Sequence, residues 1–561
     1  MKKIILISIL IFQFTNALSQ TSTWQWGLNA GNNEDDRGNG IATDSNGNVY
    51  SSGSFASSNI TFGTYTLTNN SYYSGYILKQ DTVGNVIWAK CITGTSNNIV
   101  ACGDICTDSN GNIYVVGTFQ GIVNFEDVTL TANGISDIFI IKYDLNGNQI
   151  FVKQSSNSSL YSDGGKIFVD NNGYIYITGV FGGALGSQLN FDNQTVINSV
   201  QGYQDVYLFK FDNNANAIWG KSISGITTKN VKSIGADNNG NVYLIGDFLS
   251  PTISIGNTTL TNSVSDSSTA DIYIARYNNS GDVVWAYSFG GQQYDYGRDL
   301  KVDSNGNIHA TGSFYKSSIN FNGTILQGNN SCLNTYVLEF DNNFNIIWGR
   351  SFGYDNYNSN GHSIDVDING NTYLAGDFYS SLNIGSFNLI NVGTNGWGDI
   401  YVIKYDSQGN VLEANSAGGN YIEETSKIRV SNNGDAYLTG RYYSPTLTFG
   451  THLLTNNSIF NKSDIFISKL QFNSLSINEQ LIKNKITLYP NPMISNSFLD
   501  FEEEQINTTI QIADMIGKEI KKINFSGRRM NIEKSELNRG LYFIIITNSQ
   551  NEKEIKKLVI E

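Results

Sequence analysis

The chain has 561 residues, which is too long for one ordinary core and suits a large repeat fold or two domains. Its net charge of −14 and pI of about 4.8 argue against nucleic-acid binding, because an acidic surface repels phosphate backbones. Only 4 residues are proline, and the many β-branched and aromatic residues between Gly and Asn turns predict strands and hairpins rather than helices.

The first residues have the pattern of a secretory signal. Lys2 and Lys3 form a basic start, an apolar run follows from Ile4 to about Phe14, and a polar stretch rich in small residues comes next. We predict a signal peptide over residues 1–19. The apolar run is too short for a membrane span, and no later segment is long and apolar enough, so no transmembrane segment is predicted. The mature protein is expected to be secreted or to lie on the outer cell surface.

A twelve-residue pattern returns along the chain. The segment DSNGNVYSSGSF (44–55) has a near copy in DSNGNIYVVGTF (108–119). The glycine of the shared D-x-N-G turn falls at Gly47, Gly111, Gly173, Gly240, Gly306, Gly370 and Gly434, with spacings of 64, 62, 67, 66, 64 and 64 residues. Seven units at a steady period predict a repeat architecture.

Each unit contains three β patterns. The first is a hairpin with an Asn-Gly turn, whose residues tolerate the positive φ that tight turns require. The second is a short β segment such as ITFGTYTLTN (60–69), and the third is another hairpin such as YILKQDTVGNVIWAK (76–90). Four main strands in each of seven units predict an all-β, seven-bladed β-propeller. A solenoid of stacked repeats is the alternative.

The two ends of the repeat region discriminate between a ring and a solenoid. The seventh unit stops at DIFISKLQF (464–472) without a last strand, whereas TWQWGLNAGN (23–32) precedes the first unit without a partner. Trp26 matches Trp219 of a complete unit. We therefore predict that the N-terminal strand completes the last blade and closes the ring, which removes an exposed edge. The propeller is predicted to span residues 21–472.

The composition changes after residue 472. Residues 473–484 form a polar linker, and residues 483–561 contain 12 Lys/Arg and 11 Asp/Glu, a denser charge than in the repeats. The repeat pattern is missing there, and several short segments suit strands. We predict a small β-sandwich-like domain over residues 485–561.

Four motifs follow one another in this C-terminal segment: ITLYPNPMISNSFLDF, IQIADMIGKEI, LNRGLYFIIIT and KKLVI. In this order they resemble the C-terminal sorting domain of type IX secretion cargo from Bacteroidetes. The resemblance implies passage across the outer membrane with the type IX machinery as partner, then release or surface anchoring, usually after cleavage in the linker. Strand pairing with a receptor is one way to recognise such a domain. The matching residues are Tyr489, Pro490, Asn491, Pro492, Gly517, Lys518, Gly540, Tyr542, Lys556 and Lys557.

The repeat region resembles the seven-bladed propeller repeats of secreted bacterial proteins. The resemblance rests on the copies of D-x-N-G-N-x-Y-x-x-G-x-F and of D-I-[YF]-[IV]-x-[KR]-[YF]. The activity of that family is mostly undefined. The resemblance therefore implies a fold and leaves the function open.

The turn aspartates, such as Asp44 and Asp108, carry the oxygen ligands that a calcium loop uses. Ca²⁺ takes about six to eight oxygen ligands, which five residues of a tight turn do not supply. These aspartates are expected to hydrogen-bond their own turns instead. No cofactor is predicted, and Ca²⁺ is the one cation that the pattern leaves open.

The three histidines lie in different units and have no ligand spacing, so no metal site is predicted. They are His309, His362 and His452. His309 occupies the strand position that Tyr50 and Tyr243 hold in other units, which favours a packed variant over a metal ligand.

The cysteines and the short motifs give no catalytic signal. Four cysteines in a chain of this length form no disulfide framework, although Cys91, Cys102 and Cys106 are close enough in sequence to leave one local bridge open. The sequence contains no nucleophile elbow, phosphate loop or HExxH motif. No catalytic residue is predicted.

The loops that join each outer strand to the next inner strand are the best candidate for a ligand-binding surface, because a propeller gathers them on one face near its axis. Among them are GQQYDYGRD (291–299), GYDNYNSNG (353–361) and GNYIEETSK (419–427). Their tyrosines are suited to stacking on a sugar, and their carboxylates to hydrogen bonding it or to coordinating a cation. The candidate ligand-binding residues are Tyr294, Asp295, Tyr296, Tyr354, Asp355, Tyr357, Tyr421 and Glu423.

The leading hypothesis for function is a non-enzymatic binding, adhesion or scaffold module with a glycan or a protein as ligand. The alternative is a polysaccharide hydrolase or lyase with its site on the central face, where carboxylates from different blades can meet. A cluster of carboxylates in a deep axial pocket would favour the enzyme. A shallow, uncharged funnel lined by tyrosines would favour binding.

Overall fold

The computed structural model describes residues 22–472 and 486–560, apart from 96, 158–160, 316, 354–356, 394–395, 459–460, 515–517, 535–536 and 549–552. The chain divides into two compact units, Met1–Asn473 and Ser474–Glu561. The predicted signal peptide, 1–19, and linker, 473–484, lie outside the described residues. Within the described ranges, no helix has the length and apolar character that a membrane crossing requires.

The larger unit is built from repeated copies of a four-stranded antiparallel sheet, which are called blades below. In the first blade, β2 (Asp36–Thr43), β3 (Val49–Phe55), β6 (Ser74–Gln80) and β7 (Val86–Gly94) follow one another from the inner edge to the outer edge. The turn between β2 and β3 requires the left-handed conformation at Gly47, whose φ is 78°.

Six further sheets repeat this order, which makes seven blades in the described chain. The second contains β8 (Val100–Thr107), β9 (Ile113–Phe119), β12 (Asp137–Tyr143) and β13 (Gln149–Gln154), followed by the short β14 (Ser156–Asn157). The third contains β15 (Tyr161–Ser162) and β16 (Lys166–Val169), both paired with β17 (Ile175–Gly182), then β20 (Gln204–Phe211) and β21 (Ala217–Gly225). The fourth contains β22 (Lys229–Ala236), β23 (Val242–Phe248), β26 (Asp271–Tyr277) and β27 (Val283–Phe289).

The remaining blades follow the same plan. The fifth contains β28 (Asp295–Val302), β29 (Ile308–Tyr315), β32 (Leu333–Phe340) and β33 (Ile346–Phe352). The sixth contains β34 (Ser359–Val366), β35 (Thr372–Phe378), β38 (Asp399–Tyr405) and β39 (Val411–Gly419). The seventh contains β40 (Glu423–Val430), β41 (Ala436–Tyr442), β44 (Asp464–Gln471) and, as its outer strand, β1 (Thr23–Ala30).

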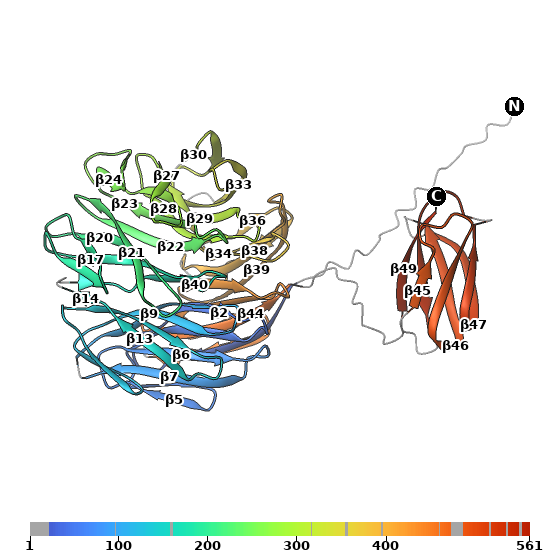
Figure 1. The fold of residues 1–561 in the computed structure, drawn as a ribbon, viewed down its shortest axis with the longest axis horizontal. Helices are drawn as coiled ribbons and strands as arrows, with labels where there is room; N and C mark the ends of the chain where they lie inside the picture. The colour runs from blue at the N-terminus through green and yellow to red at the C-terminus, as the bar shows by residue number, and fades with distance from the viewer. Residues whose placement is uncertain are drawn as a thin grey trace. The chain divides into compact units, whose positions relative to one another are not determined.

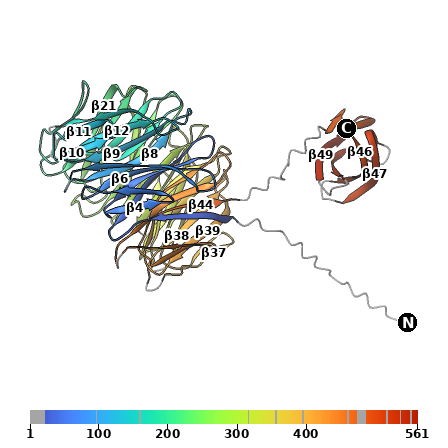
Figure 2. The same ribbon diagram turned by 90° about the horizontal axis from the view of Figure 1, so that it is seen from below.

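The N-terminal strand closes the ring. β1 pairs antiparallel with β44, from Thr23 opposite Gln471 to Ala30 opposite Ile465. Each inner strand lies against the inner strand of the next blade, and β40 lies against β2. Figures 1 and 2 both show strands of the blue N-terminal part beside the orange strand β44. The prediction of an all-β propeller closed by its N-terminal strand is confirmed, and the open solenoid is wrong.

Short hairpins at the rim link neighbouring blades. Where the sequence predicted one additional β segment per unit, the structure forms two strands, because residues with positive φ such as Gly63 reverse the chain. In several hairpins the first strand pairs with the outer strand of the preceding blade: β10 with β7, β24 with β21, and β42 with β39. The hairpins are β4–β5 (Asn59–Phe62, Tyr65–Thr68), β10–β11 (Ile122–Phe125, Val128–Thr131), β18–β19 (Gln188–Phe191, Gln194–Ile197), β24–β25 (Thr252–Ile255, Thr258–Thr261), β30–β31 (Ser318–Phe321, Thr324–Gln327), β36–β37 (Leu382–Ile384, Phe387–Leu389) and β42–β43 (Thr446–Phe449, His452–Thr455).

The hydrophobic core lies between adjacent blades. Ile245 and Ile274 of the fourth blade belong to the same buried cluster as Leu300 and Leu338 of the fifth. Both faces of the second and third strands of a blade are therefore covered, and β3 is buried at every position. This double burial explains why these strands are rich in apolar residues without the polar alternation of a half-exposed strand.

No disulfide joins Cys91, Cys102 and Cys106 in the described part of the propeller. Burial raises the pKa of Cys91 to about 11 and that of Cys102 and Cys106 above the ordinary thiol range. The local disulfide that the sequence left open is not formed.

The smaller unit is a five-stranded β domain. It contains β45 (Ile486–Tyr489), β46 (Asn496–Asp514), β47 (Glu519–Glu533), β48 (Gly540–Thr547) and β49 (Lys553–Ile560). β45 pairs with the first half of β46 and β48 with its second half, on either side of breaks in the β46–β47 register. Leu499 and Ile510 from the two halves share one buried cluster with Ile544. Figure 2 views these strands end-on around a common interior, which agrees with the predicted sandwich-like domain.

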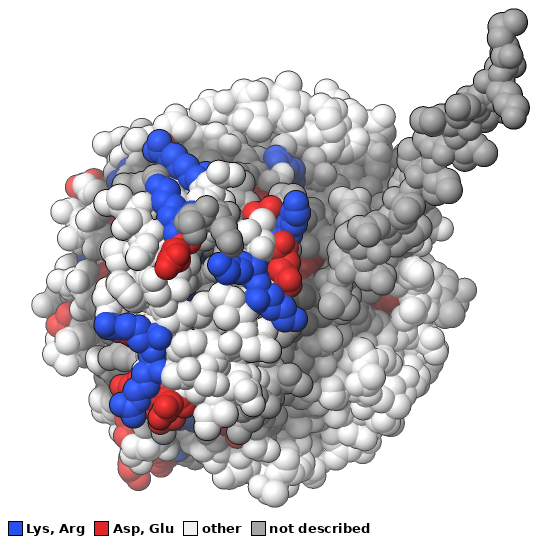
Figure 3. Space-filling model, turned by 90° about the vertical axis from the view of Figure 1, so that its right-hand side faces the viewer, with Lys and Arg blue, Asp and Glu red and all other residues white. Residues whose placement is uncertain are grey.

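The surface carries charges of both signs close together. In the view of Figure 3 most of the surface is uncharged, and Lys and Arg side chains lie near Asp and Glu rather than in a field of one sign. This agrees with a charged content of 15%.

Candidate ligand-binding face

The predicted ligand-binding loops lie on one face of the ring. Each precedes an inner strand: residues 290–294 lead into β28, 353–358 into β34 and 420–422 into β40. The inner strands all start at this face and end at the tight turns of the opposite face. The face that carries these loops is called the loop face below.

Two of the predicted tyrosines, Tyr294 and Tyr357, are exposed on the loop face, and Tyr296 is half-buried. Tyr294 is 41% exposed and its ring is stacked on that of Tyr296, with centroids 6.0 Å apart. The guanidinium carbon of Arg298 lies 4.7 Å from the Tyr296 ring centre. Tyr357 is 44% exposed. Tyr354 and Asp355 lie outside the described residues.

The two described carboxylates of the predicted set do not face solvent. Asp295 and Glu423 are the first residues of β28 and β40, and both are buried. The Asp295 carboxylate accepts a hydrogen bond from the backbone N–H of Tyr315 at 3.2 Å, and Glu423 accepts one from the Ser444 hydroxyl. The structure therefore corrects their assignment as ligand contacts, because these groups hold the loop face together from inside.

Burial of Glu423 makes the stability of the propeller depend on pH. Burial raises its pKa to about 8 in the folded protein, from 4.5. Between these values the unfolded chain has released the proton and the folded chain keeps it, so stability falls as pH rises through this window. Burial also raises the pKa of Asp36 and Asp399 to about 7, which acts in the same direction.

We expect Glu423→Gln to be more stable than the wild type at pH 8.5, by a few kcal/mol in unfolding free energy, and so to melt at a higher temperature. At pH 4.5 we expect the two proteins to differ little. Melting curves followed by circular dichroism across this pH range measure the difference. Glu424→Gln, at a side chain that is 38% exposed, is the matched control. If the melting temperature of the Glu423→Gln protein falls with rising pH as steeply as that of the wild type, the raised pKa of Glu423 is contradicted.

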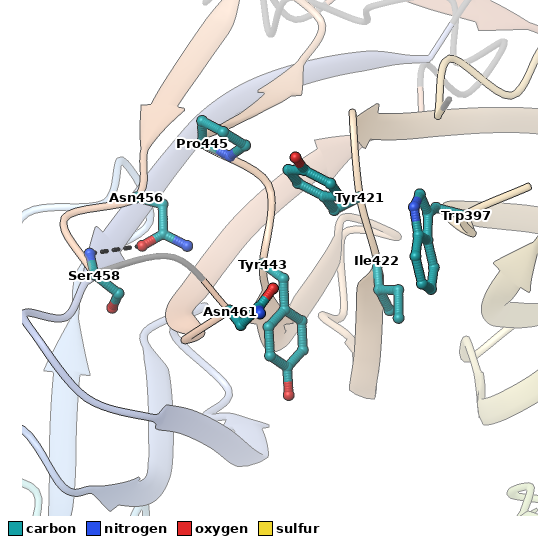
Figure 4. Close-up of a pocket in the computed structure, with 8 residues that line it drawn as sticks. All are labelled: Trp397, Tyr421, Ile422, Tyr443, Pro445, Asn456, Ser458 and Asn461. Atoms are coloured by element: carbon teal, nitrogen blue, oxygen red, sulfur yellow. Dashed lines mark hydrogen bonds between the residues drawn. The ribbon is translucent and has the colours of Figure 1, made fainter. Parts of the chain in front are cut away.

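A pocket of about 410 Å³ opens on the loop face between the sixth and seventh blades. It is formed by the loops before β38, β40 and β44 and by the connection from β41 to β42. Figure 4 shows the rings of Tyr421 and Trp397 beside Ile422, with Tyr443 below them and the two asparagines opposite. The lining residues are Trp397, Tyr421, Ile422, Tyr443, Pro445, Asn456, Ser458 and Asn461.

Asn456 fixes the shape of this pocket. Its amide donates to the backbone carbonyls of Tyr442 at 3.1 Å and Lys462 at 3.2 Å, and its oxygen accepts the N–H of Ser458 at 2.7 Å. The dashed line in Figure 4 marks the last of these bonds. Asn456 is therefore fully used in holding the loop before β44.

Other polar groups lie at the pocket. The Tyr443 hydroxyl and the Asn461 amide belong to residues that line it. Trp397 is 37% exposed. The pocket thus combines aromatic walls with a few hydrogen-bonding groups, which is the usual make-up of a small-molecule site.

Of the predicted residues, Tyr421 lines this pocket. Sequence reasoning missed Trp397 and Tyr443 because they lie in connections other than the outer-to-inner loops. A signal was present in Trp397, since a tryptophan in the Gly-rich stretch TNGWGD is outside the repeat pattern.

A second hollow, of about 250 Å³, lies at the axis of the ring. Most inner strands contain a β-bulge here, and the extra residue is Lys232, Arg298 or His362 in three of them. A bulge re-aims a side chain away from the regular ladder, which brings these three toward the axis. The lining residues are Lys166, Lys232, Arg298, His362, Glu424, Thr425, Ser426 and Lys427.

Ion pairs lie beside this hollow, around a smaller cavity that Lys301, Asp365 and Lys427 help to line. The Lys427 ammonium lies 2.8 Å from the Asp299 carboxylate, and both side chains are buried. Burial alone would raise the pKa of Asp299, but the charges of Lys427 and Arg429 outweigh it and lower the pKa to about 2. Lys301 pairs with Asp365 at 3.3 Å.

The axial hollow is therefore neither a pocket with a cluster of carboxylates nor an uncharged funnel lined by tyrosines. Its one lining carboxylate among the described residues is Glu424, so it lacks the facing carboxylates of a glycoside hydrolase. It is also not an uncharged funnel, because Lys166, Lys232 and Arg298 give it a positive wall, in which the Lys232 ammonium lies 3.9 Å from the buried Asp247 carboxylate. His362 contacts the Asp377 carboxylate at its edge.

In the smaller unit, the Tyr-Pro-Asn-Pro motif joins the first strand to the last. The Asn491 amide donates to the backbone carbonyl of Lys557 at 2.6 Å, and its oxygen accepts the N–H of Val559 at 2.8 Å. The Tyr489 hydroxyl donates to Asp500 at 2.7 Å. The motif residues thus hold the domain together.

Several other motif residues make hydrogen bonds within the domain. The Pro490 carbonyl accepts from the Ser497 hydroxyl at 2.5 Å, and the N–H of Lys518 donates to Asp514 at 2.9 Å. Tyr542 is buried and its hydroxyl donates to the Asn538 carbonyl at 3.0 Å. Pro492 follows Asn491, Gly540 begins β48, Lys556 and Lys557 lie in β49, and Gly517 lies outside the described residues.

The sequence matches two families. Residues 487–561 match the family described as "Secretion system C-terminal sorting domain", and residues 25–54 match the one described as "Beta-propeller repeat". The larger unit has a β-propeller fold, and the second match falls within it. More particularly, the C-terminal domain is a type IX secretion sorting domain of the kind found in Bacteroidetes, and the protein is secreted or lies on the outer cell surface.

Two curated proteins and one solved structure are among those similar to parts of the chain. An uncharacterised WD repeat-containing protein of Acanthamoeba polyphaga mimivirus is 24% identical over 338 residues, which are 50% of this chain and 24% of that protein. An endo-acting ulvan lyase of Formosa agariphila is 28% identical over 185 residues, which are 29% of this chain and 36% of the lyase. The crystal structure of a puromycin hydrolase mutant matches with a TM-score of 0.39 at 8% identity. The match covers 83% of this chain and 58% of the hydrolase chain.

Proposed function

We propose that the protein is an exported carbohydrate-binding module whose primary site is the pocket between the sixth and seventh blades. The observation that supports it best is the pairing of aromatic walls, Trp397 and Tyr421, with the amide of Asn461 in a 410 Å³ hollow. Aromatic rings cover the apolar face of a sugar ring, and the polar groups at their edges hydrogen-bond its hydroxyls.

The ligand extends from this pocket toward the axis. Ile422 lines the pocket and Glu424 lines the axial hollow, so the two sites meet at the start of β40. The positive wall at Lys232 and Arg298 favours a glycan that carries carboxylate or sulfate groups, because these anions pair with ammonium and guanidinium groups. An acidic oligosaccharide is therefore the proposed ligand class.

We expect the double variant Trp397→Ala, Tyr421→Ala to bind acidic polysaccharides about tenfold more weakly than the wild type. Its melting temperature is expected to stay unchanged, because both side chains line an open pocket. Affinity electrophoresis in gels that contain neutral, uronate-rich or sulfated polysaccharides measures the retention. Tyr72→Ala, which removes a 61% exposed ring from the first blade, is the matched control. Equal retention of the double variant and the wild type would end the proposal.

A polysaccharide lyase is the second candidate, because the axial hollow combines cations with a histidine. A lyase needs a base to remove a proton beside a uronate and a cation to neutralise that uronate carboxylate. His362, in contact with Asp377, and Arg298 have these chemical properties. Release of unsaturated sugars by the wild type but not by His362→Ala would favour this function over binding alone.

A further inference from the structure

Six of the seven blades share a buried arrangement at the face opposite to the loop face. A tyrosine at the start of the second strand lies beside a Lys or Arg of the third strand, and in five of these blades its hydroxyl donates to the aspartate of the D-x-N-G turn. Each cation lies 4.8–5.8 Å from the tyrosine ring centre. The tyrosine–cation pairs are Tyr50–Lys79, Tyr114–Lys142, Tyr176–Lys210, Tyr243–Arg276, Tyr373–Lys404 and Tyr437–Lys469.

The fifth blade replaces both members of the pair. His309 takes the tyrosine position, and Glu339, opposite it in the β29–β32 ladder, takes the position of the cation. The turn aspartate, Asp303, is kept. This blade therefore buries two carboxylate side chains where five of the others place a carboxylate near a cation. Lys301, two residues before the turn, is paired with Asp365 at 3.3 Å.

His309 is buried, with its Nε2 atom near the Asp303 carboxylate and its ring in one cluster with Glu339. Its exposed fraction is 0%, and within the described residues Nε2 has no hydrogen-bond partner. Nε2 lies 3.8 Å from Asp303 Oδ2, and one ligand atom from each of Asp303, His309 and Glu339 lies within 4.8 Å of the others. The sequence favoured a packed role for His309, but the structure surrounds it with metal-ligating groups.

Outer contacts hold two of these groups in place. The Nδ1 atom of His309 lies 2.8 Å from the hydroxyl of Thr372, a contact that keeps Nε2 toward the carboxylates. Glu339 accepts hydrogen bonds from the indole N–H of Trp348 at 2.5 Å and from the Asn307 amide at 2.9 Å. Such partners are typical of the groups around metal ligands.

We propose that Asp303, His309 and Glu339 bind a divalent transition-metal ion such as Zn²⁺ or Mn²⁺. One imidazole nitrogen with two carboxylate oxygens suits ions of intermediate hardness. Ligands at about 2.0–2.2 Å from a tetrahedral ion lie roughly 3.3–3.6 Å apart, so small side-chain rotations close the site. A divalent ion also supplies the charge that this blade lacks, since two buried carboxylates are costly without a cation. This site is independent of the proposed glycan binding.

The test is a metal titration of the full chain after EDTA treatment. Calorimetry with Zn²⁺ and with Mn²⁺ is expected to show one ion bound per chain, and the bound ion is expected to raise the melting temperature by several degrees. Elemental analysis checks the stoichiometry. Glu339→Gln keeps the size of the side chain and is expected to weaken binding at least tenfold.

A double variant provides a sharper comparison. His309→Tyr with Glu339→Lys restores the pair of the other blades, so we expect it to fold, to bind no ion at this site and to melt at the same temperature with and without EDTA. His362→Ala, which removes a histidine of the loop face, is expected to keep the bound ion. The proposal is overturned if the wild type binds neither ion, or if the double variant binds as the wild type does.

Discussion

Removal of residues 22–32 is expected to abolish the folded propeller at ordinary temperatures. These residues contain β1, whose backbone pairs with β44 over seven positions. Trp24 is buried, and its ring lies 4.7 Å from that of Phe449. The Trp26 indole donates to the Thr82 carbonyl of the first blade at 3.4 Å. Without β1, the ring loses the contacts that join its last blade to its first.

The size of this effect follows from ordinary magnitudes. Backbone hydrogen bonds contribute about 1 kcal/mol each, and a buried aromatic side chain contributes roughly 2–3 kcal/mol. Together these terms are on the order of 10 kcal/mol, comparable to the whole stability of a typical domain, which is about 5–15 kcal/mol. The deletion also exposes β44 as an edge strand, which promotes aggregation.

The measurement is a denaturant or thermal melt of the deletion variant, with two comparisons. Trp24→Ala is expected to cost roughly 3–5 kcal/mol, whereas Gln25→Ala, on an exposed side chain of the same strand, is expected to cost little. A synthetic peptide of residues 22–32 is expected to restore the melt of the deletion variant. A deletion variant that melts like the wild type would show that the ring does not depend on this strand.

The repeat pattern allowed most of the propeller to be predicted. The Asn-Gly turn is a local signal, and its regular return, with Gly47 as the first example, set the number of units. The strand around Trp26 could be assigned to the last blade because the pattern itself showed that the seventh unit lacked a strand. Local chemistry and counting were sufficient for both conclusions.

The ligand-binding face was less predictable because it depends on contacts between distant segments. The sequence placed Asp295 and Glu423 in loops, but both begin an inner strand and are buried. Trp397 and Tyr421 meet only when two loops of neighbouring blades fold together. The partners of His309 likewise come from the next blade and from the opposite strand, as Thr372 and Glu339 show.

Removal of residues 486–561 is expected to leave the protein inside the cell envelope, because these residues form the sorting domain. The propeller is a separate compact unit, so we expect it to fold without them. Cell fractionation of a type IX-secreting host, followed by immunoblotting, locates the truncated and full-length proteins. Efficient export of the truncated chain would contradict the sorting role.

A point variant separates folding of the sorting domain from its recognition. Asn491→Ala removes two bonds between the Tyr-Pro-Asn-Pro motif and β49, at Lys557 and Val559, so it is expected to destabilise the domain by about 2 kcal/mol and to lower export. Asn496→Ala, on an exposed side chain of β46, is the matched control and is expected to be exported normally. If the Asn491→Ala domain melts like the wild type and export is still lost, the motif contacts the secretion machinery directly. If stability and export fall together, the motif acts by holding the domain in the shape that the machinery binds.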